Sequence, residues 1–221
     1  IPLRLVGSEM CIRDSFLALQ DDFKGFVKDS LDEAFAQNLT DVAPLIASRE
    51  SAREALVAKC GENVNIRRLT AVSGDTVGAY LHGHRIGVLV VLKGGSDELA
   101  KHVAMHVAAS NPAVVSPDQV SEELVAKEKE IFLQLNADKI AGKPENIVEN
   151  MIKGRINKFL AEASLVEQAF IMDPEVKVGD LVKKAGAEIV SFVRYEVGEG
   201  IEKAENDFAA EVAAQVAASK Q

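Results

Sequence analysis

The sequence is poor in cysteine and in aromatic residues. Among its 221 residues there are two cysteines, two tyrosines and no tryptophan. Cys11 and Cys60 alone cannot supply the disulfide framework of a small secreted protein, so we expect a reducing, cytoplasmic setting. The longest apolar run, residues 86–92, has the length of a buried strand and is too short to cross a bilayer. The sequence therefore predicts a cytoplasmic protein without a membrane partner.

An excess of basic residues is also missing. Lysine and arginine number 25 against 34 aspartates and glutamates, which gives a formal net charge of −9. A general nucleic-acid binder needs a basic face that neutralises phosphates, so we expect no direct nucleic-acid partner. Apolar residues make up 48% and charged residues 27% of the chain, which is the balance of a folded globular protein.

Signatures of enzyme chemistry are absent from the sequence. Neither the phosphate-binding pattern GxxxxGKS/T nor the nucleophile pattern GxSxG occurs. Cys60 ends a predicted helix with no histidine nearby in the sequence, so a packing or contact role is favoured over that of a nucleophile. The sequence therefore predicts a binding, regulatory or structural protein that is not an enzyme and needs no cofactor.

The histidines allow two interpretations. His102 and His106 stand four residues apart in HVAMH, a spacing that can bind zinc. The catalytic form of this motif has a glutamate after the first histidine, and Val103 stands there instead. We favour a structural or contact role, with a metalloenzyme as the less favoured alternative. His82 and His84 flank a predicted turn, where a solvated tip and a partner contact are both open.

The first part of the chain changes from helical to strand periodicity. A helix over 16–37 is predicted by apolar residues at helical spacing, namely Phe23, Phe26, Val27, Leu31 and Phe35. A second helix, 41–61, is expected to begin at a Thr40–Asp41 cap and to end at Gly61. Three strands should follow, the last two joined by a tight turn, over residues 64–72, 76–83 and 85–94.

The remainder of the chain is predicted to be mainly helical. A helix over 96–110 is expected to start at a Ser96 cap. Residues 116–140 and 146–163 predict two long helices joined by a short Gly-Lys-Pro loop, and hence an antiparallel hairpin that projects from the body. The last predicted elements are a helix over 173–186, a strand over 187–200 and a terminal helix over 201–219.

The order of these elements indicates a repeat of two units. The second unit consists of a hairpin (76–94), helices (96–186) and a strand (189–197). The first unit has helices (16–61) and a strand (64–72) but no hairpin before them. We therefore expect the first unit to be truncated at its N-terminal side.

Three stretches carry a resemblance to a known family. Residues 60–95, CGENVNIRRLTAVSGDTVGAYLHGHRIGVLVVLKGG, closely resemble translation elongation factor Ts. So do KHVAMHVAASNP (101–112) and FVRYEVGEGIEKAENDFAAEVA (192–213). The resemblance begins at about residue 16 and runs to the C-terminus.

The resemblance implies an α+β fold. It consists of two related α/β core subdomains with small antiparallel sheets, a projecting helical hairpin that packs as a coiled coil, and a C-terminal helix. On this sequence the truncated first subdomain is 16–73, and the second comprises 74–115 and 164–200. The hairpin is 116–163 and the C-terminal helical module is 201–221.

The resemblance also implies a function. Members of the family are guanine nucleotide exchange factors for elongation factor Tu, and bind it in GDP-bound and nucleotide-free forms. They promote GDP release by disturbing the Mg²⁺ and phosphate site, so the mechanism is binding linkage without covalent chemistry. A homodimer, or a heterotetramer with elongation factor Tu, is an open possibility.

Five residues match the family's contacts with elongation factor Tu. The family motif TDFVA falls on DSFLA (14–18), which places Phe16 on the phenylalanine that wedges near the magnesium site and Leu17 on the following valine. His82 falls on a tyrosine-x-histidine-glycine contact, and Cys60 on an apolar contact beside it. Ile171 falls on a further apolar contact.

The sequence departs from the family pattern before residue 16. An N-terminal helical domain and the first core hairpin have no counterpart, and Ser15 replaces the aspartate before the motif phenylalanine. We therefore expect weaker exchange than an intact member shows. The alternative is a fragment that binds elongation factor Tu without efficient exchange.

Residues 6–15 have no helical or strand periodicity and no capping pattern. Their sequence, VGSEMCIRDS, matches one reading frame of a common transposon-end sequencing adaptor. We therefore expect residues 1–15 to be a non-native leader, which would leave Phe16 as the first family-like residue.

Overall fold

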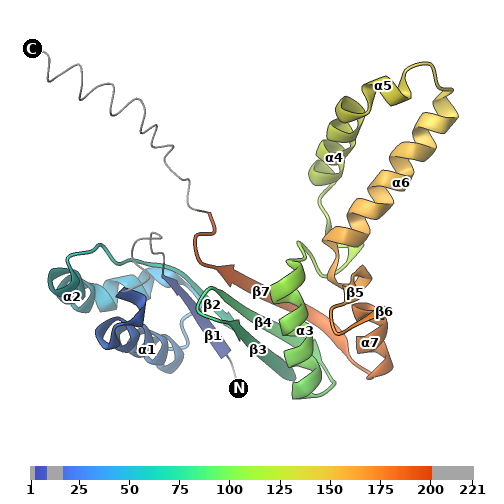
Figure 1. Ribbon diagram of the computed structural model, residues 1–221. Coiled ribbons are helices and arrows are strands. Elements are labelled where there is room, and N and C mark those ends of the chain that lie inside the picture. Colours follow the sequence, from blue (N-terminus) through green and yellow to red (C-terminus); the bar gives the residue numbers. More distant parts are fainter. Residues whose placement is uncertain (1–2, 9–16, 201–221) are drawn as a thin grey trace, which may run out of the picture.

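The computed structural model describes residues 3–8 and 17–200, and it is an α+β fold with small antiparallel sheets (Figure 1). The predicted fold class is therefore confirmed. The terminal helix predicted over 201–219 lies outside the described residues, as do Cys11 and Phe16. Within the described part of the chain, no helix is both long and apolar enough to span a membrane.

The first unit begins with a short 3-10 helix, η2 (Leu17–Leu19), and two α-helices, α1 (Asp21–Ala36) and α2 (Val42–Cys60). The caps of α2 are as predicted: the Asp41 side chain accepts a hydrogen bond from the backbone N–H of Ala43 at 3.2 Å, and Gly61 adopts a left-handed conformation with φ 74°. The predicted apolar face of α1 is wrong at Phe35, which is 46% exposed, because Ala34 is the residue that faces the core there.

A two-stranded antiparallel sheet accompanies these helices. Strand β1 (Leu3–Ser8) pairs with β2 (Ile66–Val72), with Leu3 opposite Val72. Residues 3–8, which form this strand, belong to the segment 1–15 that is predicted to be a non-native leader. Backbone pairing does not depend on where a segment comes from, so the non-native origin of residues 1–15 stays a prediction.

A three-stranded antiparallel sheet forms the second unit. Its strands are β3 (Thr76–His82), β4 (Ile86–Lys93) and β7 (Glu188–Glu196), in the order β3-β4-β7. Gly83, with φ 58°, provides the turn of the predicted β3–β4 hairpin. The central strand β4 is buried on both faces, which explains why its sequence is a continuous apolar run.

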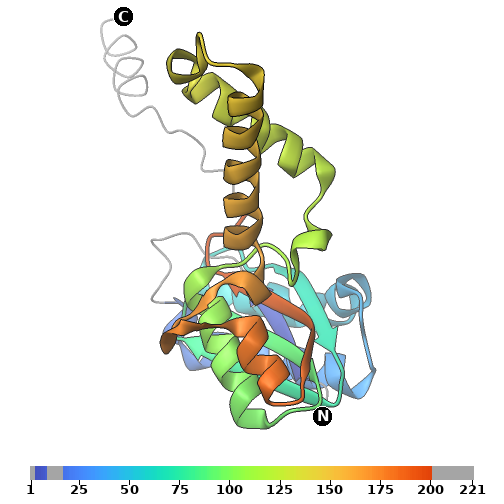
Figure 2. The same cartoon turned by 90° about the vertical axis from the view of Figure 1, so that its right-hand side faces the viewer.

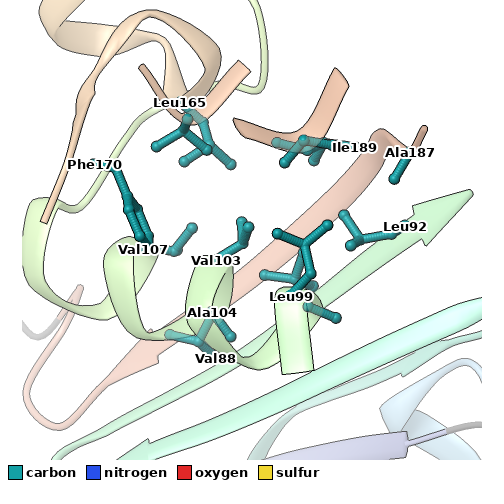
Figure 3. Packing of buried hydrophobic residues seen from close by; sticks show 14 of the residues in the cluster. Val88, Leu92, Leu99, Val103, Ala104, Val107, Leu165, Phe170, Ala187 and Ile189 are labelled. Carbon is teal, nitrogen blue, oxygen red and sulfur yellow. The ribbon is translucent and has the colours of Figure 1, made fainter. Parts of the chain in front are cut away.

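Helix α3 (Asp97–Ser110) covers one face of this sheet over β3 and β4 (Figure 1). It begins where predicted, because the Ser96 side chain accepts a hydrogen bond from the Leu99 backbone N–H at 3.2 Å. The main hydrophobic core lies between α3, the sheet and the segment that follows the helical hairpin (Figure 3). Buried members from these elements include Val88, Leu92, Val103, Val107, Leu165, Phe170 and Ile189.

The predicted helical hairpin projects from the body (Figure 2). A 3-10 turn, η3 (Pro117–Gln119), leads into α4 (Glu122–Leu135), a short α5 (Ala137–Ile140) and the long α6 (Glu145–Ala163). The single helix expected over 116–140 is wrong in two places, because α4 starts at a Ser121 cap and the chain breaks at Asn136. The arms are joined by Arg155 and Glu128 at 2.5 Å, and no residue of α4, α5 or α6 is fully buried.

The segment after the hairpin contains η4 (Leu165–Glu167), β5 (Ala169–Phe170), β6 (Asp173–Lys177) and α7 (Val178–Lys184). The helix predicted over 173–186 is wrong for its first five residues, which form β6. Lys177 is extended (φ −75°, ψ 147°), so the helix begins only at Val178. Pro174 lacks a backbone N–H, which suits the short edge ladder of β6.

The two units meet where β2 approaches the end of β7. The hydroxyls of Thr70 and Tyr195 are hydrogen-bonded to each other. The guanidinium of Arg68 stacks 4.3 Å from the Tyr195 ring centroid and donates to Glu199 at 3.1 Å. These contacts connect the first sheet to the second.

Candidate partner-binding site

His82 lies at the exposed end of the β3–β4 hairpin. Its Nδ1 is 3.2 Å from the hydroxyl of Tyr80, and the Tyr80 ring packs against the main core. The neighbouring Leu81 is 69% exposed on the opposite face of the strand. A rigid hairpin thus presents an imidazole anchored to the body beside an exposed leucine.

Ile171 lies in the two-residue turn between β5 and β6. Phe170 and Asp173 pair with each other, so Ile171 and Met172 form the tip of this turn. Their side chains are 46% and 55% exposed, whereas Phe170 is 6% exposed and belongs to the core. The turn therefore presents two adjacent apolar side chains to solvent from a well-anchored base.

His106 lies directly beneath this turn and is fully buried. Its Nδ1 accepts a hydrogen bond from the Ile171 backbone N–H at 3.2 Å, and its Nε2 is 2.9 Å from Oε1 of Gln168. Burial lowers the pKa of His106, because a charged imidazolium would be desolvated. With both ring nitrogens engaged, His106 has the structural role that the sequence favoured.

His102 and His106 do not form a group of potential metal ligands with other described residues. Among the described residues, no group of three or more histidines, cysteines, aspartates and glutamates could hold a metal ion. The lone pair of His106 Nδ1 is directed at the Ile171 N–H, so that nitrogen is not free to ligate.

Cys60 and Leu17 belong to the first unit. Cys60 is half-buried at the end of α2, with its Sγ 3.5 Å from the carbonyl oxygen of Glu62. Leu17 is only 4% exposed and packs with Phe23, Phe26 and Leu45. A direct contact of Leu17 with a partner stays a prediction, and this burial does not favour it.

The predicted contact residues do not share one pocket. They lie on separate elements: the end of α2, the β3–β4 tip and the β5–β6 turn, and Figure 1 places β5 and β6 on the side of α3 away from β1 and β2. The described part of the chain has a cavity of about 520 Å³ between α2 and β2, lined partly by the ion pair of Arg53 and Glu50. None of the four predicted contact residues that the structure describes, Leu17, Cys60, His82 and Ile171, lines it.

Sequence reasoning missed three residues of this region. Leu81 and Met172 lie next to the predicted contacts and are 69% and 55% exposed. Gln168 joins His106 to the base of the hairpin, but no sequence pattern signals it, because its partners come from other elements.

The fold, with its exposed β3–β4 and β5–β6 tips, thus defines an α+β protein whose candidate partner-binding site is spread over a broad surface.

Comparison with known proteins specifies the family. A family model described as elongation factor Ts matches residues 14–199. The chain is 91% identical over 213 residues to elongation factor Ts of Ectopseudomonas mendocina, covering 96% of this chain and 74% of that protein. It is 86% identical over 212 residues to elongation factor Ts of Stutzerimonas stutzeri, with the same coverages.

The chain belongs to the elongation factor Ts family. This membership places it among the elongation factors of translation and protein biosynthesis. The resemblance found in residues 60–95, 101–112 and 192–213 is thereby confirmed.

Proposed function

We propose that this chain is a guanine nucleotide exchange factor that binds elongation factor Tu with GDP bound and promotes GDP release. The observation that carries the proposal is its family membership over residues 14–199. The geometry supports it, since His82 and Ile171, two predicted contacts, are exposed on tips anchored to the main core.

The proposed mechanism is linkage between two ligands of elongation factor Tu. If the exchange factor disturbs the Mg²⁺ and phosphate site, each ligand weakens the other by the same factor. Rigid contacts suit this role, because a shift in an equilibrium requires an interaction that differs between the two states of the partner. Phe16 would supply the wedge, by resemblance, and the tips at His82 and Ile171 would supply binding energy.

No bond is made or broken by the chain in this proposal, so it is not an enzyme in the chemical sense. Two described side chains that could carry chemistry have other contacts: the His106 nitrogens are both hydrogen-bonded, and Cys60 packs at the end of α2. The proposed setting is the cytoplasm, without a cofactor or direct contact with nucleic acid.

The helical hairpin offers further surface for assembly. Leu124, Leu135 and Ile147 are 48%, 79% and 44% exposed along its arms. These exposed side chains leave a homodimer, or a heterotetramer with elongation factor Tu, as the assemblies that sedimentation would distinguish, and the coiled-coil packing of the arms stays a prediction.

The proposal is tested by following release of a fluorescent GDP analogue from elongation factor Tu. The wild-type chain should accelerate release in proportion to its concentration until the rate saturates. His82→Ala should reduce the rate at subsaturating concentration by roughly tenfold, the loss expected for one good interface contact. His84→Ala is the matched control on the same hairpin and should stay within about twofold of wild type.

The alternative is a chain that binds elongation factor Tu without efficient exchange. The burial of Leu17 favours this alternative, because Leu17 belongs to the motif that would disturb the magnesium site. The exposed predicted contacts, which could support binding, lie on other elements. Binding measured in the same preparation separates the two functions. Tight binding with GDP release at the spontaneous rate would support the alternative and refute exchange.

A further inference from the structure

A polar network around the buried ring of His106 connects three segments beneath the β5–β6 turn. His106 of α3 bonds both the Ile171 backbone and the Gln168 side chain, at 3.2 Å and 2.9 Å. The Gln168 amide nitrogen donates to the carbonyl oxygen of Glu162, near the end of α6, at 2.6 Å. The exposed turn, the helix under it and the base of the helical hairpin are therefore joined through one imidazole and one amide.

The hydrogen bonds determine the protonation of the ring. A backbone N–H can only donate, so Nδ1 of His106 must carry a lone pair toward Ile171. Glu162 supplies a carbonyl, so the Gln168 amide nitrogen points there and its oxygen faces His106. Nε2 therefore carries the proton and donates to Gln168. The network is satisfied only by a neutral imidazole protonated at Nε2.

An apolar side chain could fill the space of His106 but could not accept the hydrogen bond from the Ile171 N–H. The ring is fully buried and lies beside Phe170 of the main core, with the two ring centroids 6.0 Å apart. Without an acceptor at Nδ1, the Ile171 N–H would lose its partner beneath the tip. The ring therefore has a role beyond filling space, because its Nδ1 accepts the hydrogen bond that holds the backbone of the exposed two-residue turn.

We propose that His106 is a positioning residue: through its Nδ1 it holds the Ile171–Met172 tip in the conformation that contacts the partner, and through Gln168 it couples that tip to the base of the helical hairpin. The inference rests on the proposed function, because the partner is elongation factor Tu. His106 itself does not touch the partner, being fully buried.

Two substitutions divide the network. His106→Asn (H106N) keeps an acceptor near the position of Nδ1 and loses the bond to Gln168. His106→Gln (H106Q) keeps a donor near the position of Nε2 and leaves the Ile171 N–H without an acceptor. H106Q should weaken binding to elongation factor Tu by roughly five- to tenfold, and H106N by about twofold or less. His102→Gln, one turn earlier on α3, is the control and should bind like wild type.

A double-mutant cycle separates positioning from general stability. Ile171→Ala removes one of the two side chains that the network is proposed to hold, so the effect of H106Q on affinity should be smaller in that background than in the wild-type background. Native-state hydrogen exchange supplies a second readout: the Ile171 amide should lose protection in H106Q and keep it in H106N. A role in stability alone would lower the unfolding midpoint of both variants without this selective pattern.

Several results would overturn the inference. These are wild-type affinity in folded H106Q, the full loss from H106Q persisting in the Ile171→Ala background, or unchanged protection of the Ile171 amide. If H106Q does not fold, a tenfold loss of affinity in H106N contradicts the proposal. A wild-type chain that does not bind elongation factor Tu would refute the proposed function, and hydrogen exchange would still decide whether His106 holds the turn.

Discussion

Gly78 of β3 packs directly against α3, and we predict that Gly78→Ala destabilises the protein. Gly78 faces α3 on an edge strand, opposite Val90 of β4. A Cβ added there would stand 2.5 Å from the carbonyl oxygen of Ala100 and 2.7 Å from its Cβ. Two of the atoms it would meet belong to the helix backbone, so no side chain can rotate away to make room.

The magnitude follows from the kind of displacement required. Helix α3 must move away from the sheet or β3 must bend, and both loosen the core around Val88, Val103 and Ala104. Overpacking of this type costs about 1–3 kcal/mol, and contact with backbone places the expected loss toward the upper end. We therefore expect the free energy of unfolding to fall by about 2 kcal/mol.

Urea unfolding followed by far-ultraviolet circular dichroism measures this loss. The matched control is Gly154→Ala on the exposed side of α6, where an added Cβ has nothing within 4 Å. Alanine has the higher helix propensity by about 1 kcal/mol, so the control should be as stable as wild type or more stable. An unfolding free energy of Gly78→Ala equal to that of wild type would refute the packing described for β3 and α3.

Two further predictions concern pH and a helix cap. Burial lowers the pKa of His106 in the folded protein, whereas in the unfolded chain it keeps the ordinary histidine pKa of about 6.5. As the pH falls below that value, the unfolded chain takes up the proton first and the folded state loses stability. The loss stops once the pH is below the folded-state pKa. Unfolding free energies of wild type and H106N between pH 7.5 and 5 should therefore converge or cross as pH falls, and parallel curves would contradict the buried neutral ring. Ser96→Ala should cost about 1 kcal/mol by urea unfolding, because it removes the acceptor of the Leu99 N–H, whereas exposed Ser51→Ala within α2 should not destabilise. Equal stability of the two serine variants would show that the cap contributes nothing.

Local signals in the sequence were sufficient for most elements of the fold. The Asp41 and Ser96 caps and the stop at Gly61 all act through residues within four positions of one another, so the chain itself contains both partners. The continuous apolar run of β4 likewise indicated a buried strand. The wrong assignments fall where tertiary pairing overrides helical propensity, as in β6, or where a side chain interrupts a helix.

Asn136 illustrates the second case. Its amide nitrogen donates to the Phe132 carbonyl oxygen at 2.9 Å, so the side chain competes with the helix backbone and separates α4 from α5. Periodicity of apolar residues carries no information about such a competition.

The candidate site was predictable only in part. The turn residues around Gly83 indicated an exposed His82, and the resemblance indicated Cys60 and Ile171. The network beneath Ile171 was not predictable, because His106 is separated by 62 residues from Gln168 and by 65 residues from Ile171. Only the packing of α3 against the segment after the hairpin brings these partners together.

The central claim is that this chain and GDP weaken each other's binding to elongation factor Tu. The most direct test measures four dissociation constants: the chain with nucleotide-free and with GDP-saturated elongation factor Tu, and GDP with and without saturating chain. The first ratio divides the chain's dissociation constant for GDP-saturated elongation factor Tu by that for the nucleotide-free form. The second divides the dissociation constant of GDP with saturating chain by that without it. The account predicts that the two ratios are equal, as linkage requires, and that both exceed one. Ratios of one, with tight binding of the chain, would contradict exchange and leave a protein that binds elongation factor Tu without acting on its nucleotide.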